Sequence, residues 1–392
     1  MFKGLAATLG LWVVGAVLLR TIMVPAQVCP AIDADEATLG AQRAADWIAR
    51  VQAPAGTYLY EYDIEANREV PGYNVVRHAG VTMSLYQLAA EGYGAETLDA
   101  ADRGLAYMTA NLVEYEGWRA FIDPSDGGIE VGASALMLAG LAQRRIATND
   151  GQHDGLMRDL ARYLVAMQQA DGSFLLRWLP ETGEPDPTQR SRYATGEAFW
   201  SLTLMHRFFP AEGWDRPARA VADYLSLYRD EVEGLRFPPW ADQWAAFGLS
   251  EMASWPLNED NVRYARRLSE RFGFLIRTEA QRRDSRFSDL IHGRRARAAG
   301  MGTWVEALDS LWRLASVDPR LSDLVPKLAE RAICGAGMLR DRQVSPGEAS
   351  NYTNPGVAEG AWFTEGKTRM DDQQHALSGL IRARPILAEA GK

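Results

Sequence analysis

Apolar residues recur three and four positions apart in six separate stretches of the chain, with polar residues between them. This spacing puts the apolar side chains of each stretch on one face of a helix. The pattern therefore predicts six amphipathic helices, each with one buried face. Their apolar positions are Trp47, Ile48 and Val51; Leu105, Met108 and Leu112; Leu156, Leu160, Leu164 and Met167; Val221, Tyr224, Leu225 and Tyr228; Val262, Ala265 and Leu268; and Leu321, Leu324 and Leu328.

A second set of six segments alternates with the first and is small and apolar on nearly every side. Helices of this kind are buried on all faces. The strict alternation predicts an all-α fold, an (α/α)6 toroid of six helical hairpins whose inner ring is wrapped by an outer one. An open α-solenoid, with the inner helices along a concave face, is the alternative. The inner segments are residues 76–89, 131–142, 196–206, 240–253, 302–315 and 371–383.

Glycines near the ends of the amphipathic helices predict the turns toward the inner segments. Strand signals are weak, and only residues 58–62 are expected to pair locally. The six glycines are Gly56, Gly117, Gly172, Gly234, Gly273 and Gly337.

The N-terminal segment differs from the rest of the chain. Residues 4–19 are uncharged and apolar and lie between Lys3 and Arg20. The run is short for a membrane span and is typical of a secretory signal or signal anchor. We therefore expect residues 1–26 to be a signal peptide or membrane anchor, 27–38 a linker and 39–388 a single toroid domain. The protein would be exported, either periplasmic or anchored to the inner membrane by this segment.

The two cysteines, Cys29 and Cys334, would then lie in an oxidising compartment. A disulfide that ties the N-terminal tail to the body and two unpaired thiols both remain open. The formal net charge of −9 argues against a nucleic-acid partner. The sequence also lacks a phosphate-binding loop, a dinucleotide fingerprint and a G-x-S-x-G motif.

Two of the amphipathic helices end in the same motif. Residues 47–58 and 163–174 each carry an aromatic residue near the helix end, then a glutamine, a glycine four residues later and a second aromatic two residues after that. The motif resembles the QW-type repeat of the terpenoid-cyclase and protein-prenyltransferase toroids, which similar glycan-active toroids carry in a looser form. The resemblance implies structural roles, tying a helix end to the next loop, for Gln52, Tyr58, Gln168 and Phe174.

The catalytic patterns of the best-known members of this superfamily are missing. A triterpene cyclase needs an acidic motif in the ring, but the nearest acidic run, residues 33–36, lies outside it. A protein prenyltransferase needs a zinc cluster, and the body contains only one cysteine, Cys334. We therefore expect no metal and no cofactor, although the fold is shared.

Catalytic mouths of such toroids are built from the loops that enter the inner helices and from the first turns of those helices. Charged residues at these positions are costly to bury unless they are paired or line a wet cavity. The candidates for catalysis are Asp372, Glu197, Asp371, His78 and Glu306. The candidates for substrate binding are Arg77, Tyr73, Tyr193, Trp240, Asp242, Gln243, Trp244, Trp304, Tyr352, Trp362, Gln373 and His375.

Paired carboxylates among aromatic rings suit glycoside chemistry, because one acid assists the leaving group, the other acts as base or nucleophile, and the rings stack on sugars. We expect a glycoside hydrolase acting on a bacterial polysaccharide. If Asp372 and Glu197 face each other across the mouth, their separation would tell a retaining from an inverting enzyme. A uronate lyase or epimerase using His78, Tyr193 and Arg77 is the alternative within enzymes. Two alternatives are not carbohydrate-active enzymes: a terpenoid-cyclase-like protein, and a non-catalytic toroid that binds glycan or protein.

Each candidate also has a structural explanation. Asp371 and Asp372 can cap a helix. Buried glutamates can pair with Arg77 or Arg369, histidines can be satisfied in the core, and any one Trp can be core. Six arginines between residues 282 and 297 predict a solvated or lipid-facing loop, or else a contact for an anionic polymer at the rim of the mouth.

Overall fold

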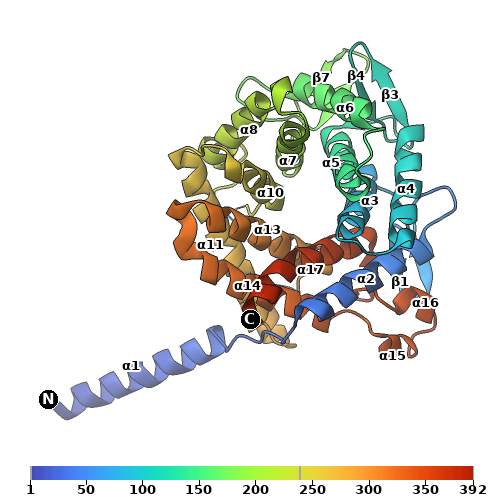
Figure 1. Ribbon diagram of the computed structural model, residues 1–392. Coiled ribbons are helices and arrows are strands. Elements are labelled where there is room, and N and C mark those ends of the chain that lie inside the picture. The colour runs from blue at the N-terminus through green and yellow to red at the C-terminus, as the bar shows by residue number, and fades with distance from the viewer. Residues whose placement is uncertain (1, 238–239, 392) are drawn as a thin grey trace.

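A closed double ring of helices forms the body of the protein (Figure 1). The computed structural model describes residues 2–237 and 240–391. Consecutive inner helices contact one another, and the last, α17, also contacts the first, α3, so that the ring is closed. This closure confirms the (α/α)6 toroid and excludes the open solenoid. The inner helices are α3 (Val75–Ala90), α5 (Val131–Thr148), α7 (Ala194–Phe208), α10 (Gln243–Glu251), α13 (Ala298–Val317) and α17 (Met370–Ala390).

The outer helices surround this ring and bury one face each. In α6 the residues Leu156, Leu160 and Leu164 are buried while the opposite face is in solvent. In the inner helix α7, by contrast, every residue from Ala194 to Met205 is buried. The two hydrophobic patterns therefore separate the two rings as predicted. The outer helices are α2 (Ala34–Val51), α4 (Ala95–Ala110), α6 (Asp154–Met167), α8 (Asp215–Leu227), α11 (Glu259–Gln281) and α14 (Val325–Asp341).

Short strands join the hairpins. Strand β1 pairs antiparallel with β2 and also with β8, which directly precedes α17, so this sheet links the first and last units of the ring. The local pairing expected at 58–62 is thus present in part, as β1. The strands are β1 (Glu61–Asp63), β2 (Arg68–Val70), β3 (Leu112–Tyr115), β4 (Trp118–Phe121), β5 (Ile129–Glu130), β6 (Arg177–Leu179), β7 (Glu184–Pro185) and β8 (Lys367–Arg369). The short helices are η1 (Pro210–Glu212), α9 (Arg229–Val232), η2 (Met252–Ser254), α12 (Arg286–His292), η3 (Pro319–Leu324), α15 (Pro346–Ala349) and α16 (Pro355–Ala358).

The glutamines of the repeated motif tie one outer helix to the next. Gln52 Nε2 donates to the carbonyl oxygens of Gly56 (3.1 Å) and Ala100 in α4 (3.0 Å). Gln168 Nε2 donates to the carbonyl oxygen of Pro217 in α8 (3.0 Å). Both side chains therefore hold the end of one outer helix against its neighbour, which is the structural role that the resemblance implied.

The glycines of the motif are required where they stand. Gly56 and Gly172 have φ values of +89° and +90°, and a Cβ at either position would overlap a backbone carbonyl of the next outer helix. The turns predicted at Gly273 and Gly337 are wrong, because both residues lie inside helices, α11 and α14. Gly337 instead makes room for the carbonyl oxygen of Pro30, against which a Cβ would collide.

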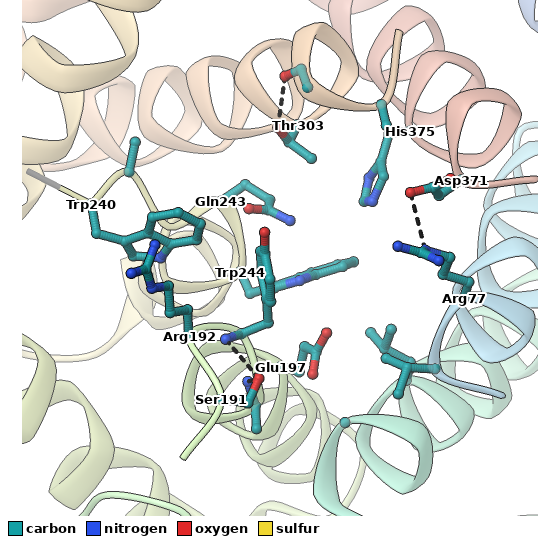
Figure 2. Close-up of a pocket in the computed structure, with 18 of the residues that line it drawn as sticks. Arg77, Ser191, Arg192, Glu197, Trp240, Gln243, Trp244, Thr303, Asp371 and His375 are labelled. Carbon is teal, nitrogen blue, oxygen red and sulfur yellow. Dashed lines mark hydrogen bonds and ion pairs between the residues drawn. The ribbon is translucent and has the colours of Figure 1, made fainter. Parts of the chain in front are cut away.

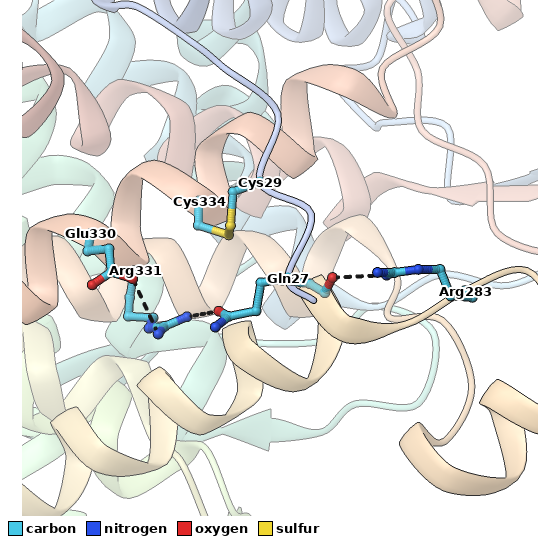
Figure 3. Close-up of a disulfide and its surroundings, with 7 residues drawn as sticks. Gln27, Cys29, Arg283, Glu330, Arg331 and Cys334 are labelled. Atoms are coloured by element: carbon cyan, nitrogen blue, oxygen red, sulfur yellow. Dashed lines mark hydrogen bonds and ion pairs between the residues drawn. A yellow bond between two sulfur atoms is a disulfide. The ribbon is translucent and has the colours of Figure 1, made fainter. Parts of the chain in front are cut away.

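The N-terminal segment is fastened to the outer ring. Cys29 and Cys334 form a disulfide, which decides between the two states that the sequence left open (Figure 3). Beside it, the amide of Val28 donates to the carbonyl oxygen of Ala280 in α11 (2.8 Å). The toroid starts at Ala34, ahead of the predicted residue 39, because the Asp33 and Glu36 side chains form a capping box there.

Helix α1 (Phe2–Met23) precedes this segment and projects from the ring (Figure 1). Its described apolar side chains are exposed, Trp12 by 76%. Within residues 2–237 and 240–391, no helix combines the length and hydropathy needed to cross a membrane. The membrane anchor predicted for residues 1–26 therefore gains no support, and export remains a prediction.

Candidate active site

A cavity of about 890 Å³ opens at the N-terminal ends of the inner helices (Figure 2). All six inner helices contribute to its wall, because their first turns converge there. The tryptophans do not plug it. Of the predicted candidates, nine line it: Arg77, Tyr193, Glu197, Trp240, Gln243, Trp244, Trp304, Asp371 and His375.

Glu197 comes from the first turn of α7 and is only 4% exposed. Its carboxyl group has no hydrogen-bond or ion-pair partner among the residues that the structure describes. Gly132 of α5 makes room for it, since a Cβ there would overlap Glu197 Oε2. Burial raises the pKa of Glu197 to about 8, and the negative charges of Asp242 and Glu130 add to the effect. At neutral pH the group is therefore largely a protonated acid at a cavity wall.

His375 faces the cavity from α17, and Glu306 of α13 holds it from behind. The His375 Nδ1 lies 3.1 Å from Glu306 Oε2, and Glu306 is fully buried. Burial by itself lowers the pKa of His375, but the charges of Glu306, Asp371 and Asp372 outweigh it and raise the pKa overall. A carboxylate that accepts from Nδ1 leaves Nε2 as the proton-accepting nitrogen of the neutral ring. This nitrogen has no partner within the described part of the chain.

Asp371 also lines the cavity, but two arginines bind its carboxylate. Arg369 binds both of its oxygens, at 2.6 and 2.8 Å, and the Nε of Arg77 lies 3.2 Å from Oδ2. Burial opposes ionisation of Asp371, yet these arginines more than offset it, and its pKa is lowered. Asp371 is therefore ionised and held in place, which makes it a weaker candidate for proton transfer than Glu197.

Aromatic side chains mark two levels of the cavity. At the rim, the rings of Tyr193 and Trp240 meet edge to face, with centroids 5.2 Å apart, and Tyr193 is 47% exposed. Deeper, the buried Trp244 stacks on Trp200, with centroids 5.5 Å apart, and approaches the ring of His375. The rim pair is accessible to a ligand, whereas Trp244 forms part of the wall.

Asp372, the first catalytic candidate, does not line the cavity with Glu197. It is 1% exposed, forms an ion pair with Arg297 and accepts from the backbone amides of Ala299 (3.1 Å) and Arg369 (3.0 Å). Burial raises its pKa, and Arg297 opposes that shift. These contacts fasten the start of α17 to the start of α13, so the position of Asp372 corresponds to the helix-capping alternative.

His78 and Tyr73 also lie outside the cavity wall. His78 is fully buried, with Nδ1 2.7 Å from the Tyr73 hydroxyl and Nε2 2.9 Å from the carbonyl oxygen of Gly104. Burial lowers the pKa of His78 to about 4. Both ring nitrogens are satisfied, so this is a core histidine that joins α3 to α4.

The remaining candidates are held by other parts of the fold. Asp242 is fully buried, caps α10 and pairs with the buried Arg229. Gln373 donates to Thr368, and the Trp362 indole donates to the carbonyl oxygen of Leu339. Tyr352 stacks on a phenylalanine in the same C-terminal loop region. None of these four side chains lines the cavity.

The prediction missed Arg192, which lines the cavity beside Tyr193. It lies in a loop that enters an inner helix, so the rule used for the other candidates would have found it. Among the described residues, no group of three His, Cys, Asp or Glu side chains is arranged to hold a metal ion.

No family model matches this sequence, and no curated protein matches it. Solved structures do. A GH76 α-mannanase of Bacteroides thetaiotaomicron superposes with a TM-score of 0.60 at 11% identity, over 91% of this chain and 97% of that one. A cellobiose 2-epimerase of Spirochaeta thermophila gives 0.60 at 14%, over 90% and 95%. A D-mannose isomerase gives 0.57 at 11%, over 88% and 97%.

All three are sugar-converting enzymes, and membership of the terpenoid-cyclase superfamily is not shown. At such low identity the likeness concerns the fold alone. The chain has the (α/α)6 toroid fold of these enzymes.

Proposed function

We propose that this protein is a carbohydrate-active enzyme that works by acid–base catalysis in the cavity of its ring. One observation carries the proposal: the protonated, unpartnered Glu197 opens onto the same cavity as His375, whose Nδ1 is held by Glu306. An acid and a base with pKa values shifted by burial and by a charge partner are typical of catalytic sites. The aromatic rim and the sugar-converting enzymes with the same fold favour a sugar as substrate.

Hydrolysis of a glycosidic bond is the first candidate reaction. Glu197 would donate its proton to the glycosidic oxygen as the bond from the anomeric carbon to that oxygen breaks. Water would attack the anomeric carbon and lose its proton to His375 Nε2, and solvent exchange would then restore both groups. In this scheme Glu197 is the acid, and His375 takes the place of the second carboxylate that was expected to act as base or nucleophile.

Epimerisation or isomerisation of a free sugar is the second candidate. It is favoured by the base being a histidine, since the other two carboxylates on this wall already have arginine partners, Asp371 in Arg77 and Arg369 and Glu130 in Arg177. His375 would remove the proton from the carbon beside the carbonyl of the open-chain sugar, while Glu197 protonates the carbonyl oxygen. His375 then returns a proton to carbon while a hydroxyl of the enediol gives its proton back to Glu197, which completes either reaction without an external reactant.

An assay in D2O separates the two reactions. The full chain is incubated with α-manno-oligosaccharides, cellobiose, mannose and the counterpart of cellobiose that ends in glucuronic acid, and the products are followed by NMR. Hydrolysis releases new reducing ends without deuterium on carbon, whereas epimerisation or isomerisation places deuterium next to the carbonyl. If no neutral or acidic sugar is converted, the proposal fails.

The variant that tests Glu197 is Glu197→Gln. We expect turnover to fall at least about a hundredfold, because general acid catalysis contributes about that much. Melting at pH 8 should occur at no lower temperature than in the wild type, because the amide never has to hold a proton in a buried site. The control is Glu184→Gln, which changes an exposed glutamate and should leave both properties unchanged. An active Glu197→Gln would remove this residue from the mechanism.

Export is also part of the proposal. The disulfide between Cys29 and Cys334 and the apolar run at 4–19 support an oxidising compartment outside the cytosol. A polysaccharide outside the cell would be accessible to an enzyme located there.

A further inference from the structure

We infer that the sugar bound in this cavity carries an anionic group, a carboxylate as in a uronic acid, and that the guanidinium of Arg192 binds it. The inference rests on the proposed function and names its substrate class. It is built on the charges around the cavity and on the arrangement of its rim.

Arg192 is the arginine of this wall that lacks a carboxylate. Its side chain is exposed at the rim, with the guanidinium carbon 5.6 Å from the centre of the Trp240 ring. Within the described residues no Asp or Glu lies in ion-pair distance of it. Its own backbone is fixed, because its carbonyl oxygen accepts a hydrogen bond from the buried Arg229. Arg192 is therefore an exposed cation at the cavity rim, with its backbone carbonyl held by Arg229.

The other arginines of the wall already have carboxylate partners, and one carboxylate is shared. Asp371 alone serves both Arg77 and Arg369. Arg297 is matched by Asp372 behind the wall, and Glu130 is matched by Arg177.

Glu197 adds little negative charge at neutral pH, because its pKa is raised to about 8. The charges of the wall therefore leave an excess of positive charge on a chain whose formal net charge is −9. A cavity of one sign in a protein of the other sign concentrates ligands of opposite charge.

The rim has the parts needed to bind an acidic sugar. Tyr193 and Trp240 present aromatic surface on which a pyranose ring can stack. The planar guanidinium beside them can bind a carboxylate with two parallel hydrogen bonds.

A second cation lies across the cavity from the first. Figure 2 shows Arg192 and Arg77 on opposite sides. Arg77 donates through Nη1 to the Tyr60 hydroxyl and pairs through Nε with Asp371, and its Nη2 has no partner among the residues that the structure describes, so this nitrogen is available to a ligand. An acidic sugar would thus meet positive charge on both sides.

The test compares two disaccharides that differ only in one group, cellobiose and the same disaccharide ending in glucuronic acid. Affinities for the full chain are measured by calorimetry. We expect the acidic disaccharide to bind at least tenfold more tightly than the neutral one, and added salt to weaken only the acidic one. Arg192→Gln should lose about ten- to a hundredfold in affinity for the acidic sugar and little for the neutral sugar.

Arg236→Gln is the matched control. Arg236 is 71% exposed and pairs with Glu231 outside the cavity, so its loss should not change either affinity. Arg192→Met, which keeps an unbranched apolar stem and removes the charge, serves as a second variant and should behave like Arg192→Gln. A disaccharide with a sulfate ester in place of the carboxylate tells a sulfated glycan from a uronic acid, since preferential binding of the sulfate would assign the anion to that source.

Equal affinity for neutral and acidic sugars, or equal losses of both in Arg192→Gln, would overturn the inference. Turnover of the neutral sugars in the D2O assay would in that case leave the proposed function standing. Tight binding of the acidic sugar without turnover of any sugar would instead support the inference and overturn the enzymatic proposal.

Discussion

Glu197 keeps its proton because of where α7 places it. Burial and the nearby carboxylates raise its pKa from 4.5 to about 8. Below pH 4.5 the group is protonated whether the chain is folded or not. As the pH rises from 4.5 through 8, the unfolded chain releases the proton first, so folding loses stability over that window. The fold thus keeps Glu197 protonated at a cost in folding stability. Raised pKa values of this kind are typical of catalytic carboxyl groups.

The contact between Glu306 and His375 can be tested by a single substitution. We predict that Glu306→Gln lowers the pKa of His375, because the variant removes the neighbouring charge that most raises it. The amide oxygen can still accept from Nδ1, so the ring keeps its orientation. If His375 is the base, activity rises with pH through its pKa. That acidic limb should therefore move to lower pH, as measured from the pH dependence of kcat/KM.

Glu330→Gln on the outer surface is the comparison for this measurement. Glu330 pairs with Arg331 and is 69% exposed, so the pH profile of this variant should match that of the wild type. An acidic limb that stays in place in Glu306→Gln would remove His375 from the role of base.

The close approach of helices α5 and α7 decides where the acid sits. Gly132 lets the Glu197 carboxyl group lie against α5. We predict that Gly132→Ala displaces this carboxyl group and lowers kcat at least about tenfold, since catalytic groups tolerate little misplacement. The free energy of unfolding should change by less than about 1 kcal/mol, because alanine favours the helix and a flexible side chain can give way.

Gly140→Ala in the same helix is the control. A Cβ there would come no closer than 3.5 Å to any atom, an ordinary contact with Met83. This variant should keep full activity and gain up to about 1 kcal/mol of stability from helix propensity. Full activity in Gly132→Ala, measured under saturating substrate, would contradict the role given to the contact.

Helix geometry also explains why two adjacent aspartates differ. Consecutive residues of a helix point about 100° apart. At the start of α17, Asp371 therefore faces Arg77 and the cavity, while Asp372 faces Arg297 and the first turn of α13. The pair looks like one acidic motif in the chain, but the helix turns its two members toward different neighbours.

For the whole molecule, the disulfide adds a covalent link between the N-terminal segment and α14. Cys29 and Cys334 are 305 residues apart in the chain, so the bond restricts the unfolded state strongly. We predict that the double variant Cys29→Ser, Cys334→Ser loses about 2–4 kcal/mol of stability. Activity at 25 °C should be retained, because neither cysteine lines the cavity. Thermal melts and kcat measure the two effects.

Reductant provides the control for this variant. Adding it to the wild type should lower the melting temperature toward that of the double variant and should leave the double variant unchanged. Identical melts of oxidised wild type and double variant would contradict the stabilising role of the bond.

The periodicity of apolar residues was sufficient to predict both rings of helices and their order. Whether a helix buries one face or all of its faces can be predicted from its own segment, because the apolar pattern that decides this repeats every few residues along the chain. The glutamines and glycines after α2 and α6 were also predictable, since their partners lie at the same place in each unit. The inner-helix starts line the cavity, as was expected of the loops and first turns there, and Glu197 and His375 were among the candidates.

The choice among those candidates depended on contacts between distant parts of the chain. Asp372 is held by an arginine 75 residues away, His78 by the carbonyl oxygen of Gly104 in the next outer helix, and Cys29 by a cysteine at the far end of the sequence. A charged residue at the start of an inner helix faces either the cavity or a neighbouring helix, and helix rotation and available partners decide which. The local sequence pattern contains neither the rotation of a helix nor the partners around it. Only the closed ring therefore shows that Glu197 and His375 face the cavity, whereas Asp372 and His78 hold neighbouring helices together.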